Sequence, residues 1–390
     1  MSRLSDDELD DIRARNPVAA VAGQYVKLRS AGGRLVGPCP ICGGGASSGR
    51  FRVFDDESWG CAVCPDGGDV IRLVEKVEGC DFRAAIERLG GRTAIDPVHA
   101  QKMFEAREAK RIAREKESDR YREAERKRLW KMWDGAGDIH ETDAELYVAG
   151  RGLRLPEACP GLRYLDRAPY WHGEQIDERG RKSPVSLHTG PAMLGAFIRA
   201  DGKFGGLHIT WLAGTEDGFI VKKELADPAT GEVLPSKKMR GSKAGAHIAV
   251  ALKASPRRLI IGEGIETVLA VYTAHIHTGR AIADTAFWAA GDLGNMAGRA
   301  IENVAHPVAV RPDGRAVRVP GPYPDPDDAG LSIPDSVAEL VLLGDGDSEP
   351  VLTQYAMERA ARRYARAGRE IRIAFAPAGR DFNDVLRGEG

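Results

Sequence analysis

The chain has 390 residues, of which 43% are hydrophobic and 29% are charged, and its 56 Lys and Arg nearly balance its 57 Asp and Glu. This composition excludes a collagen-like, disordered or membrane-spanning chain, because no apolar run approaches the ~18 residues of a spanning helix. The N-terminus is polar and acidic and carries no secretory signal, so we expect no membrane partner. With a net charge of −1, any basic binding surface must be local and offset by acidic residues elsewhere.

Cysteine spacing gives the first chemical signal. Four of the six cysteines form two Cys-x-x-Cys pairs, Cys39 with Cys42 and Cys61 with Cys64, and 18 residues separate the pairs. Two such pairs complete the four-thiolate tetrahedron of a structural zinc site, which leaves no open position for water. Iron in the same cage and a redox-active dithiol stay open as alternatives. Thiolates kept free for a metal indicate a reducing compartment, so we expect the cytoplasm.

The segments around these cysteines predict a small zinc-ribbon domain over residues 1–95. The strands and helices expected there lie at 51–54, 59–61, 70–77 and 82–89. A charged helical linker is expected next, at 96–132, because residues 101–131 include 12 basic and 7 acidic residues and no Gly or Pro. Such a run usually forms a solvated helix face, and contact with nucleic acid is the alternative.

Residues 133–255 are predicted to form a mixed α/β subdomain, and a regular alternation begins at Arg257. Short, fully apolar strands that alternate with helices predict a parallel sheet covered on both faces. The expected strands are 259–261, 286–290, 340–343 and 371–375, and the expected helices are 265–275, 296–304 and 351–365. A Pro-rich loop at 311–334 is expected as an insertion. The predicted fold class is a multidomain α+β and α/β chain that ends in a parallel sheet flanked by helices.

Acidic residues follow three of the predicted strands. Glu263 follows the first, Asp345 and Asp347 follow the third, and Asp381 and Asp384 follow the last. If these strands are parallel neighbours, the carboxylates meet at one edge of the sheet and repel one another unless cations neutralise them. Hard oxygen ligands suit Mg²⁺ or Mn²⁺, and three acidic sites at strand ends favour metal-dependent phosphoryl-transfer chemistry.

A basic run lies between two predicted turns. It contains Lys237, Lys238, Arg240 and Lys243, which are candidates to bind a polyphosphate or a nucleic-acid backbone. A solvated loop is the alternative. The chain has no Walker A loop, because the closest string, residues 44–51, lacks both the Lys and the Ser/Thr that the loop requires.

The order of these pieces resembles the bacterial and phage DnaG-type DNA primases. Residues 10–43 and 59–91 resemble the zinc-binding domain of that family. The strings that resemble its polymerase domain are LYVAGRGL at 146–153, LRYL at 162–165, AMLGAFIRADGKFGG at 192–206 and SKKMRGS at 236–242. Residues 256–390 resemble a Toprim domain, whose three motifs would be Gly262-Glu263-Gly264, Asp345-Gly346-Asp347 and Asp381-Phe382-Asn383-Asp384.

This resemblance implies a nucleotidyltransferase, a DNA-directed RNA polymerase that makes short RNA primers on single-stranded DNA from nucleoside triphosphates during replication. The residues expected to be catalytic are Glu263, Asp345, Asp347 and Asp381, which with Asp384 would hold Mg²⁺ or Mn²⁺. The residues expected to contact nucleotide or template are Lys237, Lys238, Arg240 and Lys243. Arg50, Arg52 and Trp59 are expected to offer charges and a stacking face to single-stranded DNA, and packing within the ribbon is the alternative for them. A replicative helicase is a further candidate partner.

Three departures from the family's pattern stand beside the resemblance. Cys42 occupies a position where many members have His. Where many members have an Arg after a Gly-Gly pair, this chain reads Gly205-Gly206-Leu207-His208, which leaves part of the basic nucleotide site unassigned. The third is the absence of a helicase-interaction domain after the last Toprim motif, as expected for a short primase of a mobile element. Two other functions stay open: a Toprim-type metal-dependent nuclease, and a zinc-ribbon accessory protein that binds single-stranded DNA without catalysis.

Overall fold

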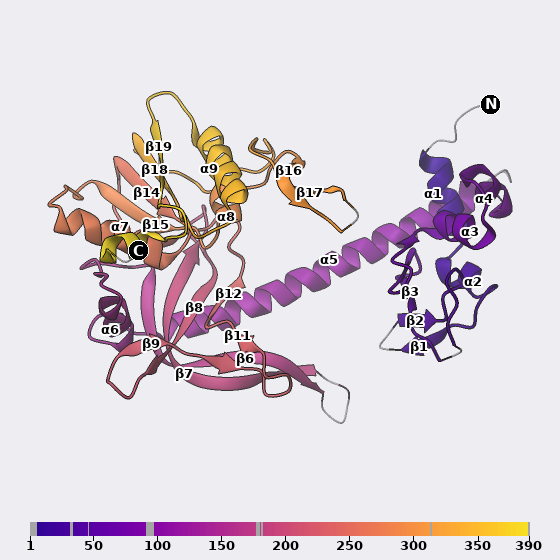
Figure 1. Ribbon diagram of the computed structural model, residues 1–390, viewed down its shortest axis with the longest axis horizontal. Coiled ribbons are helices and arrows are strands. Elements are labelled where there is room, and N and C mark those ends of the chain that lie inside the picture. The colour runs from indigo at the N-terminus through magenta and orange to yellow at the C-terminus, as the bar shows by residue number, and fades with distance from the viewer. Residues whose placement is uncertain are drawn as a thin grey trace. The chain divides into compact units, whose positions relative to one another are not determined.

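Figure 1 shows the computed structural model, which describes residues 6–31, 34–45, 47–90, 97–176, 180, 182–312 and 314–388. The chain divides into two compact units, Met1–Ser118 and Asp119–Gly390. Each unit has hydrophobic cores of its own. Among the described residues, none of the helices combines the length and the apolar character needed to cross a membrane.

The first unit is built on an antiparallel sheet of five short strands in the order β1-β2-β3-β4-β5. Alternation along β3 decides what the sheet buries, because Phe51 and Val53 are buried while Arg52 between them is exposed. The strands are β1 (Arg29–Ala31), β2 (Arg34–Gly37), β3 (Phe51–Phe54), β4 (Ser58–Cys61) and β5 (Gly67–Gly68). The helices are α1 (Asp6–Arg15), α2 (Val18–Ala22), α3 (Val70–Glu78) and α4 (Phe82–Arg88). The predicted zinc-ribbon fold is confirmed.

The charged segment forms one helix, α5 (Pro97–Asp134), as the sequence predicts. The division between the two units falls inside it, after Ser118. Its last turns carry Leu129 and Trp133, which are buried in a core of the second unit. The end of this helix therefore belongs to the packing of the second unit rather than to a solvated linker.

A strongly bent antiparallel sheet in the order β12-β8-β7-β6 forms the first half of the second unit, with β9 paired to β8. Alternate side chains of β7 point to opposite faces: Leu194 and Ala196 pack with α5, whereas Met193 and Phe197 pack toward the C-terminal sheet. The elements of this region are α6 (Asp143–Gly150), β6 (Leu162–Ile176), β7 (Lys182–Ile198), β8 (Phe204–Gly214), β9 (Ile220–Lys222), β10 (Leu225–Ala226), β11 (Val233–Leu234) and β12 (Lys237–Gly241).

The C-terminal sheet has the order β13-β15-β14-β18-β19, and all of its pairs are parallel except β13 with β15. Its strands are β13 (Ile248–Ala251), β14 (Arg258–Gly262), β15 (Thr285–Ala289), β18 (Glu339–Gly344) and β19 (Glu370–Phe375). Its helices are α7 (Ile265–His277), α8 (Leu293–Ala297), α9 (Pro350–Tyr364) and α10 (Phe382–Arg387). The predicted parallel sheet between helices is confirmed. β13 lies before the domain boundary expected at residue 255, yet it pairs in this sheet.

One predicted helix is wrong. The segment 296–304 was expected to be helical, but α8 ends at Ala297 and residues from Asn303 onward form a hairpin. The hairpin joins β16 (Asn303–Val310) to β17 (Ala316–Pro320), so part of the expected Pro-rich loop at 311–334 is strand (Figure 1). Gly298, in a left-handed conformation with φ of 67°, follows α8 and explains why the helix stops there.

Candidate active site and metal centre

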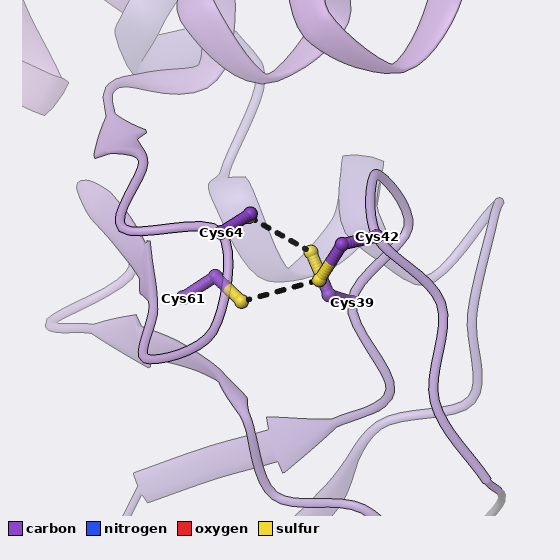
Figure 2. Close-up of side chains that lie close together, drawn as sticks. All are labelled: Cys39, Cys42, Cys61 and Cys64. Atoms are coloured by element: carbon purple, nitrogen blue, oxygen red, sulfur yellow. Dashed lines mark hydrogen bonds between the residues drawn. The ribbon is translucent and has the colours of Figure 1, made fainter.

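The four paired cysteines converge on one point in the first unit. Figure 2 shows their side chains meeting from two loops, with Cys39 Sγ 3.9 Å from Cys64 Sγ and Cys42 Sγ 3.6 Å from Cys61 Sγ. A zinc ion about 2.3 Å from each of four sulfurs sits in a tetrahedron whose edges are about 3.8 Å. All four sulfurs lie within 4.8 Å of one another. The observed spacing therefore fits zinc with little adjustment.

Backbone N–H groups complete this cysteine cage. The amides of Ile41 and Val63 donate to Cys39 Sγ and Cys61 Sγ, each at 3.4 Å. Burial acts to raise the pKa of Cys61, but donation from the Cys64 and Val63 amides outweighs it and lowers that pKa to about 7. Burial and the neighbouring cysteines raise the pKa of Cys39 and that of Cys64, the latter to about 12. Since the thiolate is the form that binds a metal, a cation is needed to hold all four side chains as thiolates at neutral pH.

The structure corrects the role expected for Trp59. Its side chain is only 2% exposed, stacks on Phe51 with ring centroids 5.4 Å apart, and donates from Nε1 to the Asp69 carbonyl at 3.0 Å. Trp59 pairs with Val53 across β3 and β4, on the buried face of the sheet. It is a core residue and offers no stacking surface to DNA. Arg52 is exposed on the opposite face, and Arg50 lies beside the cage, with Nη1 4.0 Å from Cys42 Sγ.

The second site lies at the carboxyl ends of three neighbouring parallel strands. β14, β18 and β19 are adjacent in the C-terminal sheet, and Glu263, Asp345 and Asp381 follow them in turn. Two backbone hydrogen bonds join the loops after β18 and β19: Gly346 N to Arg380 O at 2.9 Å, and Gly379 N to Gly346 O at 2.7 Å. We call Glu263, Asp345, Asp347 and Asp381 the acidic rim.

Gly346 has a packing reason to be glycine. A Cβ at this position would lie 2.1 Å from the Pro377 carbonyl oxygen, well inside van der Waals contact. Only glycine therefore lets the loop after β18 approach the loop after β19 this closely. The approach brings Asp345 near enough to Asp381 for their charges to repel.

Asp345 is the most perturbed carboxylate of the acidic rim. Its Oδ2 accepts a hydrogen bond from Thr267 Oγ1 at 2.9 Å, but its Oδ1 is buried with no hydrogen-bond partner among the described residues. Burial, with repulsion from Asp347 and Asp381 and against the Thr267 hydrogen bond, raises the pKa of Asp345 to about 6. A buried oxygen that lacks a partner and carries repelled charge has the chemistry of a ligand for a divalent cation.

Two lysines face the acidic rim. Burial raises the pKa of Glu263, repulsion from Asp345 and Asp347 adds to this, and Lys237 and Lys243 act against it. Lys243 also forms an ion pair with Asp292. Both lysines are thus close enough to Glu263 for a negatively charged group bound at the rim to interact with them.

The expected set of five magnesium ligands does not form one cluster. Among the described residues, only the four cysteines are gathered closely enough to hold a metal by three or more side chains. Asp384 forms a capping box with Asp381: Asp381 Oδ1 accepts from Asp384 N at 2.7 Å, and Asp384 Oδ2 accepts from Asp381 N at 3.1 Å. The spaced carboxylates fit the common Mg²⁺ arrangement, in which one or two protein ligands leave positions for phosphate and water.

Strand alternation divides the basic run of β12 between two faces. Lys237 pairs with Thr210 and points to the face that carries the acidic rim. Lys238 and Arg240 pair with Ile209 and Leu207, which belong to the core under α5. Lys238 Nζ donates to the Trp171 carbonyl at 2.8 Å, and Arg240 Nη2 lies 2.7 Å from Glu125 Oε1. The phosphate-binding role predicted for Lys238 and Arg240 is thus not supported, since both already have structural partners.

Sequence reasoning missed a buried ionic network beside the acidic rim. Glu266, whose side chain is 15% exposed, lies 2.9 Å from Arg151 Nε and 2.9 Å from Lys222 Nζ, and accepts from Tyr147 OH at 2.9 Å. Burial acts to raise the pKa of Glu266, but Lys222 and Arg151 outweigh it and lower that pKa. The only sequence signal was a second Glu three residues after Glu263, in the first turn of α7.

His208 lies near the same network. It is buried on β8, and desolvation, with repulsion from Lys237 and Lys222, lowers its pKa to about 4. It is therefore neutral at physiological pH and supplies no positive charge. Lys237 and Lys222 are cations near His208, and Lys222 and Arg151 are paired with Glu266.

Known families match three parts of the chain. Residues 4–105 match the CHC2 zinc finger, residues 329–390 match the Toprim domain, and residues 123–250 match a family described as a domain of unknown function (DUF7146). The chain is similar to the DnaG-type DNA primases. The zinc finger and the Toprim domain contain the cysteine cage and two of the three strand ends of the acidic rim. The region that contributes Lys237 matches a family without a described function.

Relatives with a described activity match a shorter part. The DNA primase of Streptomyces coelicolor is 36% identical over 95 residues, which cover 24% of this chain and 14% of that protein. The DNA primase of Halalkalibacterium halodurans is 31% identical over 94 residues, 24% of this chain and 15% of that protein. The chain thus matches about one seventh of the length of these relatives.

Solved structures are more distant. The Aquifex aeolicus primase, with its zinc-binding and RNA polymerase domains, is 15% identical, with 99% of this chain and 83% of that chain covered and a TM-score of 0.31. The primase fragment of the bacteriophage T7 primase-helicase is 13% identical, with 90% and 94% covered and a TM-score of 0.31.

Proposed function

We propose that this protein is a DNA primase, a nucleotidyltransferase that joins ribonucleotides on a single-stranded DNA template. The observation that carries the proposal is the acidic rim itself, in which Asp345 Oδ1 is buried without a partner among the described residues while lysines face the carboxylates. Polymerisation needs these two features together, because the acids hold cations and the lysines hold the triphosphate. The similarity to DnaG-type primases and the CHC2 zinc finger support the same function.

In this proposal, Asp345 and Asp381 hold Mg²⁺ or Mn²⁺, with Asp347 at the exposed side of the acidic rim. The cation would neutralise the triphosphate and increase the acidity of the primer 3′ hydroxyl. Glu263, whose raised pKa suits proton transfer, accepts the hydroxyl proton as the oxygen attacks the α-phosphorus. The bond between the α-phosphorus and the bridging oxygen breaks, and pyrophosphate leaves. Lys237 and Lys243 stabilise the charge on the phosphates.

The first unit would hold the template. Arg50 lies beside the cysteine cage and Arg52 is on the exposed face of β3, and this exposure supports the proposal that both contact a DNA backbone. The cage is structural, because four thiolates leave no ligand position for water. We place the reaction in the cytoplasm, where these thiolates stay reduced, and a replicative helicase is the further partner to test.

Primer synthesis on single-stranded DNA tests the proposal. The full chain is incubated with template, labelled ribonucleotides and Mg²⁺ or Mn²⁺, beside the double variant Asp345→Ala with Asp347→Ala. Asp217→Asn, an exposed carboxylate in the turn after β8, is the matched control. We expect short labelled oligomers from the wild type and the control, and none from the double variant. Template degradation without oligomers would instead indicate a nuclease, and zinc-dependent DNA binding without either product would indicate an accessory protein.

A further inference from the structure

A second candidate binding surface lies on the opposite side of the bent sheet from the acidic rim. It is a cavity of about 650 Å³ between the last turns of α5 and the turn that joins β7 to β8. This volume falls within the ~300–1,000 Å³ typical of ligand pockets. The residues that give it its character are Arg126, Lys127, Trp130, Lys131, Lys203 and Phe204. We call it the α5 pocket.

The sheet separates the α5 pocket from the acidic rim. Leu129, one residue before Trp130, packs with Leu194 and Leu207 on one face of β7 and β8. On the other face, Phe197 packs with the core of the C-terminal sheet. Its ring lies so close to Gly291 that a Cβ added to this glycine would be 2.7 Å from Phe197 Cζ. A molecule in the α5 pocket therefore touches none of the carboxylates of the rim. The pocket is a separate site and belongs entirely to the second unit.

The charge of the α5 pocket is strongly positive. Five basic side chains line it, against one acidic side chain, Glu123. Glu123 forms an ion pair with Arg126, in which Oε2 lies 2.5 Å from Nη2, and its Oε1 lies 3.8 Å from Lys127 Nζ. Lys131 has no acidic partner among the described residues. Lys203 Nζ lies 3.7 Å from Asp201 Oδ2, but the Lys203 side chain is still 69% exposed. In a chain with a net charge of −1, this surplus is a local feature that attracts polyanions.

An exposed aromatic ring stands among these cations. Trp130 is 46% exposed, although its neighbour Trp133 is buried, and it meets Phe204 edge-on with centroids 5.4 Å apart at 73°. The contact with Phe204 fixes the position of the indole ring without covering it. Rings held beside lysines are the combination that binds single strands, because each base stacks on an aromatic ring while phosphates meet the cations.

We propose that the α5 pocket binds single-stranded DNA, with one base stacked on Trp130 and the flanking phosphates on Lys127, Lys131 and Lys203. Single-stranded rather than duplex DNA fits, because only unpaired bases present a face that a ring in a pocket can reach. The site is additional to the template contacts proposed for the first unit and for the acidic rim. Its ligand binding does not require the polymerisation reaction.

Fluorescence anisotropy with a labelled oligo-dT tests this proposal in magnesium-free buffer on the full chain. Trp130→Ala is expected to weaken binding about tenfold, since base stacking contributes ~1–3 kcal/mol per base, and Trp130→Phe to restore most of the affinity. Lys127→Ala with Lys131→Ala is expected to reduce the salt dependence of log affinity by about 1.4, at ~0.7 per phosphate contact. The matched control is Arg120→Ala with Arg122→Ala, two exposed residues of the same helix that do not line the pocket.

Several results would overturn the proposal. One is unchanged affinity in both pocket variants while they keep the wild-type melting temperature. Another is an equal loss in the control, which would indicate a general charge effect. Competition by polyglutamate as strong as that by oligo-dT would indicate an acidic protein partner instead. Photo-crosslinking of an iodouridine-containing DNA oligomer supplies a second readout, and we expect its adducts at Trp130.

The outcome also separates this site from the proposed primase reaction. Asp345→Asn should reduce primer synthesis ~100-fold or more and leave oligo-dT binding at the α5 pocket unchanged. Trp130→Ala should weaken binding while the acidic rim keeps its cation affinity. If no primers form under any condition, the α5 pocket is still tested by binding alone.

Discussion

The cysteine cage and the acidic rim, the two candidate metal sites of this protein, differ in the sequence separation of their side chains. The cysteine cage takes four ligands from 26 consecutive residues, Cys39 to Cys64, and every sulfur already lies at zinc-binding distance from its neighbours. The acidic rim takes its carboxylates from three strand ends between Glu263 and Asp381, and they stay too far apart to form one ligand cluster. In the proposed function, the first site is closed and structural, whereas the second keeps positions for a substrate.

This difference predicts that loss of the metal unfolds the protein around the cysteine cage but leaves the fold around the acidic rim in place. Zinc binding to small cysteine sites supplies ~10–16 kcal/mol, which is comparable with the whole stability of a domain. Divalent cations at the acidic rim would instead relieve repulsion in a fold that already has large hydrophobic cores.

Removing zinc should unfold the first unit and leave the second intact. Cys61→Ser deletes one of four ligands, so zinc should be lost and residues 6–90 should lose protection in hydrogen exchange. Cys80→Ser is the control, because Cys80 lies outside the cysteine cage and donates only a weak bond to Val74 O at 3.9 Å. A zinc-free first unit that kept its exchange protection would show that the cage is not structural.

Asp345→Asn should separate activity from stability. The variant removes a buried, repelled charge and keeps the size of the side chain, so we expect primer synthesis to fall ~100-fold or more. The melting temperature of the second unit, measured without divalent cations, should rise by a few degrees. The reason is that a carboxyl whose pKa is raised to about 6 in the folded state destabilises that state at neutral pH. Retained activity with a lower melting temperature would contradict both parts.

Neutralising Glu266 should lower stability, whereas neutralising Asp345 should raise it. Glu266→Gln removes the charge that pairs with Arg151 and Lys222, and breaking a buried ion pair on one side costs about 3 kcal/mol. Since the pKa of Glu266 is lowered on folding, its contribution is present above the unfolded pKa and disappears as pH falls. The loss should therefore be full at pH 7 and shrink below pH 5 in thermal unfolding. Glu216→Gln, exposed in a turn, should have no effect.

The smallest effects are expected for Lys237 and Lys238, neighbouring lysines of β12, and they should differ between activity and stability. Lys237→Met should reduce primer synthesis about tenfold and leave stability unchanged, because Lys237 faces the acidic rim and is exposed. Lys238→Met should lower stability by about 1 kcal/mol, since Lys238 donates to Trp171 O and lies 3.6 Å from the centre of the Tyr170 ring. Equal activity losses would show that both lysines contact the substrate.

The parts of the fold that could be predicted are those determined by local pattern. The cysteine spacing, the apolar strands and the charged run of α5 each specify an element without reference to the rest of the chain. The prediction that β14, β18 and β19 are parallel neighbours is confirmed. It could be made because apolar strands joined by helices form parallel sheets. The site assignments themselves stay predictions.

The errors arose where tertiary packing decides. Trp59 on β4 pairs with the buried Val53 on β3, whereas Arg52, next to Val53, points to the exposed face. The burial of Trp59 therefore depends on the strand register, which composition does not reveal. The same alternation divides Lys237 from Lys238. Glu266 was missed because its partners Arg151 and Lys222 are more than 40 residues away and become neighbours only when α6 and β9 pack beside α7.

Iron-directed cleavage tests most directly whether the acidic rim holds a divalent cation. Fe²⁺ replaces Mg²⁺, and with ascorbate and peroxide it produces radicals that cut the backbone next to the bound ion. We predict cuts near Glu263, Asp345 and Asp381 that excess Mg²⁺ suppresses and that Asp345→Asn abolishes. Cuts that persist in Asp345→Asn, or that occur only in the first unit, would contradict a catalytic cation at the rim.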